Sequence, residues 1–269
     1  MLVLDDADVD AAARWGVWGA FFNAGQTCMS VERVYVVEAR YDEFVRLAVE
    51  YTKAFKMGYT TEVNSPYALG PVTDPRQVKI IEKHLQDALA KGARVLIGGQ
   101  QQGMFFSPTV LVDVNHSMLL MQDETFGPLM PIMKVKDEAE AIRLANDSTF
   151  GLAGSVWSQD VKRAERVAQQ IRAASFIIND TIAQFGIPLL PFGGVKDSGA
   201  GRTHGKEGVM QFTRPYGYAV GKPPMKWDVA TVVREPGHYA LGGMILGVAF
   251  GVTMYQRWKA LKHFTHKPG

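Results

Sequence analysis

The sequence predicts an α/β fold with a mainly parallel sheet. Short runs rich in valine, isoleucine and other apolar residues alternate along the chain with longer segments whose apolar residues recur at helical spacing. Glycine- and proline-containing stretches separate several of these segments. Strands that alternate with helices are typical of βαβ units, which place successive strands parallel in one sheet. Because ligands of such sheets bind at the carboxyl ends of the strands, we expect a site there.

The first part of the chain follows this alternation. Residues 1–4 predict a short buried strand, and the aspartates after it can cap a helix whose apolar residues face inward. A strand is expected at 31–37 and an amphipathic helix at 41–55. Residues 57–75 predict a loop, since they are rich in glycine, proline, asparagine and serine.

The alternation continues to about residue 178. One helix should end at Gly92, and another should begin after the capping residue Asp160. The expected elements are helices at 76–91, 138–146 and 160–172, and strands at 94–97, 109–112, 152–157 and 175–178.

Charge is distributed unevenly between the body and the carboxyl-terminal tail. Residues 1–213 carry 21 Lys and Arg against 25 Asp and Glu, whereas residues 214–269 carry 8 against 2. An acidic body with a basic tail indicates an anionic surface as a partner of the tail. We expect no nucleic-acid partner. We also expect no metal, because the histidines are scattered without metal-ligand spacing.

Cellular location is predicted from the cysteine content and from the first residues. A single cysteine excludes an intrachain disulfide framework and fits a reducing cytoplasm. Residues 1–4 run directly into Asp5 and Asp6 without a preceding basic region, so no signal peptide is expected. We therefore expect a cytoplasmic protein.

Cys28 is the only cysteine of the chain. It ends a small polar turn, residues 23–27, which lies between the apolar run 17–22 and the strand-like run 34–37. Such a turn can present a thiol to a cleft, with backbone N–H groups free to stabilise charge. A lone cysteine can equally be a small buried hydrophobic residue. On the residues alone, nucleophile and buried filler carry equal weight.

Three motifs resemble those of the NAD(P)-dependent aldehyde dehydrogenases. Residues 23–28 followed by 31–36 resemble the cysteine signature of that family, residues 124–128 its cofactor-ribose motif, and residues 191–202 its late glycine-rich motif. The motifs have the order and spacing of the family, and the resemblance extends over residues 1–213. It implies an aldehyde-dehydrogenase-like catalytic domain that corresponds to only the second half of such an enzyme. The dinucleotide-binding domain and the glutamate that serves as general base are absent from the sequence.

The resemblance implies roles for individual residues. Cys28 would be the nucleophile that forms a thiohemiacetal and then a thioester. Glu124 would accept hydrogen bonds from the ribose of NAD or NADP, and Phe126 would pack against the nicotinamide half. Phe192 would face the aldehyde substrate, and Asn179 resembles an asparagine that braces loops near the cysteine. Without the resemblance, Glu124 would be interpreted as a solvated loop acid and the glycine-rich segment as a structural turn.

The resemblance fades after residue 213. Residues 214–238, rich in proline and glycine, predict an extended connection. Residues 239–255 carry no Asp, Glu, Lys or Arg, and basic residues follow them. We expect residues 239–269 to attach to the cytoplasmic face of a membrane; a helix at a subunit interface is the alternative.

The predicted function is oxidation of an aldehyde to a carboxylate with NAD or NADP, by a homo-oligomer and as part of a longer chain. Two alternatives remain open. One is a non-catalytic aldehyde-dehydrogenase-like fragment, and the other is a relative that transfers its thioester to coenzyme A. The identity of the aldehyde, and the choice between NAD and NADP, are not determined by this sequence.

Overall fold

Seven strands form the sheet on which the first 214 residues are built. The computed structural model describes residues 1–220. Neighbouring strands are parallel except at one edge, where β3 pairs antiparallel with β6. The predicted α/β class with a mainly parallel sheet is therefore confirmed. The strands, in spatial order, are β10 (Ser175–Ile178), β9 (Ala153–Trp157), β1 (Leu2–Val3), β2 (Val34–Val37), β7 (Leu129–Val135), β6 (Thr109–Val112) and β3 (Arg94–Ile97).

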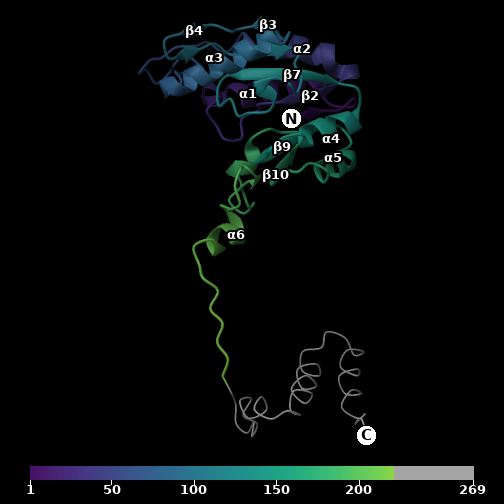
Figure 1. Cartoon of the computed structure of the whole chain (residues 1–269), viewed down its shortest axis with the longest axis vertical. Coiled ribbons are helices and arrows are strands. Elements are labelled where there is room, and N and C mark those ends of the chain that lie inside the picture. The colour runs from purple at the N-terminus through teal and green to yellow at the C-terminus, as the bar shows by residue number, and fades with distance from the viewer. Residues whose placement is uncertain (221–269) are drawn as a thin grey trace, which may run out of the picture. The chain divides into compact units, whose positions relative to one another are not determined.

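Helices cover both faces of the sheet (Figure 1). Side chains alternate between the two faces of a strand, so Val34 and Val36 enter one core while Tyr35 and Val37 enter the other. The first core contains the apolar residues of α1 (Val9–Phe21) and α2 (Glu38–Thr52). The second contains those of α3 (Pro75–Ala90), α4 (Glu138–Asn146) and α5 (Val161–Ala168).

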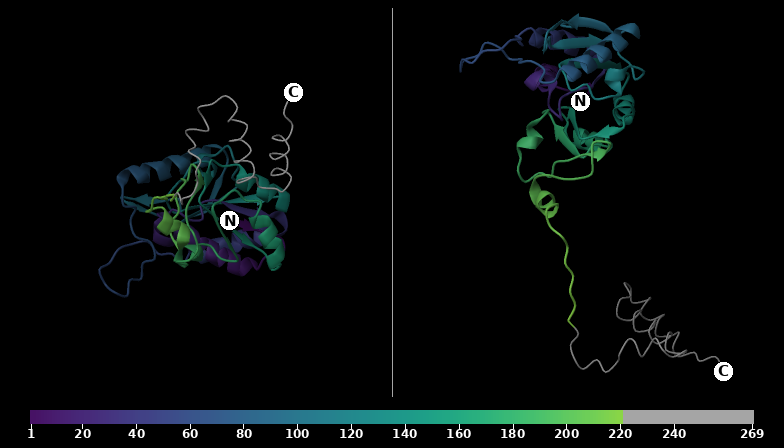
Figure 2. Two further views of the ribbon diagram at one scale, coloured as in Figure 1. Left: turned by 90° about the horizontal axis from the view of Figure 1, so that it is seen from below. Right: turned by 60° about the vertical axis from the view of Figure 1, so that its left-hand side comes forward.

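Most predicted elements are present, with small shifts at their ends. The side chain of Asp8 caps α1, that of Asp74 caps α3, and that of Asp160 caps α5. Helix α5 ends at Ala168, four residues before the predicted end, because the chain bends before it enters β10. The loop between α2 and α3 extends away from the layers in both views of Figure 2.

Strand β7 has no counterpart among the strands that the sequence predicts. It contains Pro131, and proline is normally excluded from the interior of a central strand because it lacks an N–H. Even so, β7 lies between β2 and β6, and its first four residues are buried. Pairing with β2 on one side and β6 on the other, together with burial, stabilises β7 as a strand although Pro131 disfavours a central strand. The smaller elements are β4 (Gln101–Gln102), β5 (Phe105–Phe106), β8 (Phe150–Gly151), β11 (Val195–Lys196), α6 (Gly205–Met210), and the 3₁₀ turns Phe22–Gly25, Leu119–Met121 and Ala183–Gly186.

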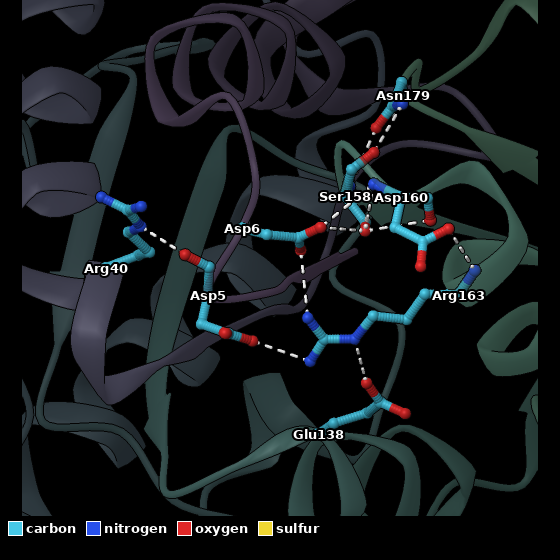
Figure 3. A network of polar contacts seen from close by, with 8 residues as sticks. All are labelled: Asp5, Asp6, Arg40, Glu138, Ser158, Asp160, Arg163 and Asn179. Atoms are coloured by element: carbon cyan, nitrogen blue, oxygen red, sulfur yellow. Dashed lines mark hydrogen bonds and ion pairs between the residues drawn. The ribbon is translucent and has the colours of Figure 1, made fainter.

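Arg163 on α5 joins three elements through its guanidinium group (Figure 3). It donates to Asp5 at 2.7 Å and to Asp6 at 3.2 Å, both of which follow β1, and to Glu138 at the start of α4 at 2.6 Å. The hydrogen bond from Arg163 holds the pKa of the Asp5 carboxyl below its ordinary value. One cation thus links two helices to a central strand.

Asn179 follows β10 and has a left-handed backbone, with φ of 55°. Its amide accepts from Ser158 N at 3.0 Å and donates to Ser158 O at 2.9 Å (Figure 3). Ser158 in turn donates to Asp6 at 2.7 Å. Asn179 therefore braces the carboxyl ends of β9 and β10. Both of its side-chain hydrogen bonds are made with Ser158, which fits the structural role expected for Asn179.

Within residues 1–220, no helix combines the length and the apolar character needed to cross a bilayer. Residues 215–220 contain no helix or strand. The remainder of the predicted connection, and the whole of the predicted tail at 239–269, lie outside the described residues.

Candidate active site

Two loops enter adjacent strands at the same edge of the sheet. Residues 22–33 connect α1 to β2, and residues 113–128 connect β6 to β7. Because β2 and β7 are parallel neighbours, their amino ends lie together, and so do the loops that lead into them. Cys28 from the first loop and Glu124 from the second line one cavity of about 380 Å³.

This cavity lies at the amino ends of the strands, so the expectation of a site at their carboxyl ends is wrong for it. Its walls include Leu2 at the start of β1, Arg33 just before β2, and residues 150–155 around the start of β9. The physical reason is connectivity. Both loops run from an element into the beginning of a strand, and such a connection reaches the sheet at the amino edge.

Cys28 follows a strained turn and is exposed. Asn23, Ala24 and Gly25 all have left-handed backbone, with φ of 53°, 57° and 72°. For residues other than glycine this conformation costs about 1 kcal/mol or more, and such strain clusters at functional sites. Among the hydrogen bonds of residues 1–220, none is donated by the Cys28 backbone N–H. Within residues 1–220 Cys28 is exposed, which favours the nucleophile over a small buried residue.

Gln26 anchors this turn to the segment before α3. Its side-chain oxygen accepts from the backbone N–H of Thr73 at 2.8 Å and from the Thr73 hydroxyl at 3.0 Å. Its amide nitrogen donates to the carbonyl of Pro71 at 3.3 Å. The turn that carries Cys28 is therefore fixed from outside as well as by its own backbone.

The Glu124 loop is held in place by the residue that follows Glu124. The Thr125 backbone N–H donates to Glu32 at 2.9 Å, its carbonyl accepts from Gln77 at 2.6 Å, and its hydroxyl lies 3.0 Å from Nδ1 of His84. The Glu124 side chain remains exposed at the cavity. Anchoring at Thr125 thus positions the Glu124 carboxylate at the cavity that Cys28 also lines.

The two loops are also in direct backbone contact. Gly25 has a φ of 72°, and a Cβ at this position would overlap the carbonyl group of Gly127. Glycine is therefore required at position 25 both by conformation and by space.

Phe126, which follows Thr125 in the Glu124 loop, is partly buried and has a φ of 47°. Its side chain does not line the cavity.

Phe192 lies outside the Cys28 cavity. It is buried and packs edge-on against Phe185, with ring centroids 5.1 Å apart, and its backbone pairs with Thr203. It is not among the residues that line the Cys28 cavity. In the same glycine-rich segment, Arg202 donates to the carbonyls of Gly194 and Gly201, each at 2.7 Å. The structure therefore brings Cys28 and Glu124 together but does not place Phe192 with them.

Sequence reasoning missed Glu32 as a residue of this site. Glu32 lines the cavity, and burial raises the pKa of its carboxyl. The signal was present in the sequence, because Glu32 is an acid just before the apolar run that forms a buried strand. Burying a carboxyl group at the start of a strand costs free energy unless hydrogen-bond donors or cations contact it.

Cationic and aromatic groups complete the cavity wall. Arg33 and Arg172 both line it, as does Tyr35, whose pKa is raised to about 12 by burial. The Tyr35 hydroxyl lies 3.1 Å from Nε2 of His116. Residues 1–220 contain no group of three or more histidine, cysteine or acidic side chains arranged to hold a metal ion.

The model of the aldehyde dehydrogenase family matches residues 1–216, which is most of the chain. The chain belongs to the aldehyde dehydrogenase family.

Individual relatives within the family show the degree of similarity. The 4,4'-diapolycopene aldehyde oxidase of Methylomonas is 46% identical over 215 residues, which cover 80% of this chain and 40% of that protein. The NADP(+) succinate-semialdehyde dehydrogenase of Escherichia coli is 39% identical over 214 residues, covering 78% and 44%. Betaine aldehyde dehydrogenase from Staphylococcus aureus, solved in complex with NAD+, is 35% identical with a TM-score of 0.74, covering 78% and 42%. The chain thus spans less than half the length of each of these proteins.

Proposed function

We propose that this chain forms the catalytic half of an NAD(P)-dependent aldehyde dehydrogenase, which oxidises an aldehyde to a carboxylate. The observation that carries the proposal is the meeting of exposed Cys28 and exposed Glu124 in one cavity. The names of the relatives, which include NAD+ and NADP(+) forms, support the family of reactions and both cofactors.

Cys28 is the nucleophile in this proposal. As a thiolate, its sulfur adds to the carbonyl carbon of the aldehyde, and the electron pair of the C=O bond moves to oxygen. The free backbone N–H of Cys28 is available to donate to that oxyanion. Loss of hydride from the thiohemiacetal carbon leaves a thioester on Cys28, and attack by water releases the carboxylic acid and restores the thiol.

Glu124 is the cofactor-binding residue in this proposal. Its carboxylate is exposed at the cavity on a loop that is fixed through Thr125, which suits it to accept hydrogen bonds from ribose hydroxyls. Bound NAD(P)+ supplies the hydride acceptor. Phe126 on the same loop and Phe192 remain in the proposal as packing residues, the first for the nicotinamide half and the second for the aldehyde.

Activity is best tested in a completed enzyme, defined as this chain joined after the amino-terminal half of the Methylomonas relative. We expect Glu124→Gln to lower kcat/KM for NAD(P) about 10-fold or more, because a misplaced nicotinamide slows hydride transfer. The measurement is aldehyde-dependent NAD(P)H absorbance over a range of cofactor concentrations.

The matched control for Glu124→Gln is Asp123→Asn. Asp123 is the neighbouring exposed acid and does not line the cavity, so the same loss of one charge should leave the constants near those of the parent. Equal constants for the parent and both variants would remove Glu124 from the site.

The same completed enzyme separates the proposal from its two alternatives. A non-catalytic fragment would fold and assemble without producing NAD(P)H. A coenzyme-A-acylating enzyme would yield the acyl thioester of coenzyme A, which chromatography distinguishes from the free acid. The proposal expects NAD(P)H and free acid in equal amounts, from a homo-oligomer.

Membrane attachment through residues 239–269 is a proposal from sequence alone. An uncharged segment of 17 residues, 239–255, is about 25 Å long as a helix, which is short against a hydrocarbon core of about 30 Å. Basic residues after it would remain at an anionic cytoplasmic face. We expect the chain to float with anionic vesicles and expect Lys259→Glu with Lys262→Glu to weaken flotation. A chain that never floats would favour the subunit-interface alternative.

A further inference from the structure

Glu32 lies in the first of the two loops of the site, and its carboxylate binds the backbone of the second. It belongs to the segment that runs from Cys28 into β2. Its Oε2 accepts from the N–H of Thr125 at 2.9 Å, and its Oε1 accepts from the N–H of Phe126 at 2.7 Å. One carboxylate therefore holds two consecutive amides of the Glu124 loop.

These two hydrogen bonds are of a strong kind. The two N–H donors favour the ionised form of Glu32 against the effect of burial, and hydrogen bonds to an ionised carboxylate are about twice as strong as neutral ones. They also stabilise an unfavourable backbone, because Phe126 has a φ of 47° and aromatic residues rarely adopt left-handed conformation. The loop conformation that presents Glu124 thus depends on an acceptor placed at this point.

Glu32 differs from the other residues that bind Thr125 in the part of the chain to which it belongs. Gln77 and His84 both belong to α3 and fix Thr125 to the helix layer. Glu32 belongs to the same segment as Cys28. Its carboxylate therefore ties the Glu124 loop to the segment that carries the nucleophile by hydrogen bonds, in addition to the packing of Gly25 against Gly127.

We propose that Glu32 is a positioning residue that fixes the Glu124 loop relative to Cys28 and so aligns the bound nicotinamide with the thiohemiacetal. This inference rests on the proposed roles of Cys28 and Glu124. It adds that cofactor alignment is set from the cysteine segment, through the backbone of Thr125 and Phe126, by a residue that itself takes no part in the chemistry.

The first test uses the 269-residue chain and does not depend on activity. In Glu32→Gln, one of the two amides loses its acceptor and faces an NH₂ group. Hydrogen exchange of the Thr125 and Phe126 amides should accelerate about 10-fold or more. Exchange in β6 should remain as in the parent. Unchanged exchange at both loop amides would overturn the inference.

The second test uses the completed enzyme and separates positioning from general loss of structure. Glu32→Gln should raise KM for NAD(P) and lower the rate of the hydride-transfer step, while KM for the aldehyde and the rate of Cys28 alkylation stay unchanged. A merely structural role would instead reduce the amount of folded enzyme and leave all constants alike. If Glu32→Gln accelerated amide exchange but only reduced the amount of folded enzyme and left its kinetic constants unchanged, the positioning role would be overturned.

Glu32→Asp keeps the test decisive if the glutamine variant does not fold. Aspartate retains two charged acceptors but withdraws them by one methylene, so it should restore part of the exchange protection and part of the cofactor KM. If Glu32→Asp showed the same exchange rates and the same cofactor KM as Glu32→Ala, the inference would be contradicted. Failure of the proposed function is recognised separately, since it would leave Glu124→Gln without effect whatever the exchange rates show.

Discussion

Cys28→Ala in the completed enzyme is expected to abolish aldehyde-dependent NAD(P)H production, with a fall of at least about 10³-fold in kcat/KM. The chain contains no second cysteine to replace it. The turn that carries Cys28 is fixed by Gln26 and by contact between Gly25 and Gly127, so the alanine variant should retain the fold. The measurement is initial-rate absorbance of NAD(P)H together with a thermal melt.

A matched control for this substitution is Met29→Leu. Met29 lines the same cavity next to Cys28, and leucine preserves its volume, so this variant should retain turnover. Alkylation provides an independent readout, since iodoacetamide should modify Cys28 faster than a model thiol near neutral pH and an aldehyde should slow the reaction. Substantial turnover by Cys28→Ala would disprove the nucleophile assignment.

Arg163→Met is expected to produce the largest loss of stability among surface-accessible charges of the body, about 2 kcal/mol in the free energy of unfolding. Removing one partner of a buried ion pair costs about 3–5 kcal/mol, and this value is reduced here because the Arg163 side chain is 24% exposed. Methionine preserves much of the apolar stem but leaves Asp5, Asp6 and Glu138 without their common cation. Urea unfolding followed by circular dichroism measures the effect.

The effect of Arg163→Met should depend on pH. Arg163 lowers the pKa of Asp5 in the folded state, so the Asp5 carboxylate contributes stability above its unfolded pKa. This contribution is lost as the pH falls through the lowered, folded value. The difference in unfolding free energy between parent and variant should therefore shrink below the ordinary aspartate pKa of 3.8.

Arg76→Met is the control for the stability measurement. Arg76 pairs with Asp74, but the Arg76 side chain is 88% exposed, so its removal should leave the free energy of unfolding close to that of the parent. The backbone cap from Asp74 to α3 is retained in this variant. Equal losses for the two variants would show that the Arg163 network is no stronger than an exposed pair.

The sequence by itself determined the elements whose signals are local. The bounds of α4, β3, β6 and β10 agree with the predicted ones, and Asp8, Asp74 and Asp160 cap helices through their own side chains. Caps, helical spacing and short β-branched runs act over a few residues, which is why they can be read from one chain. The family motifs likewise indicate Cys28 and Glu124 as candidate site residues.

The tertiary structure alone decided where these residues meet and what holds them. Strand β7 forms against its local signal because it is paired on both sides, and this pairing places the Glu124 loop beside the Cys28 loop at the amino edge of the sheet. The partners of Glu32 are more than 90 residues away along the chain. A carboxylate and two distant amides show no shared pattern in sequence, since the hydrogen bonds between them exist only after the strands are assembled.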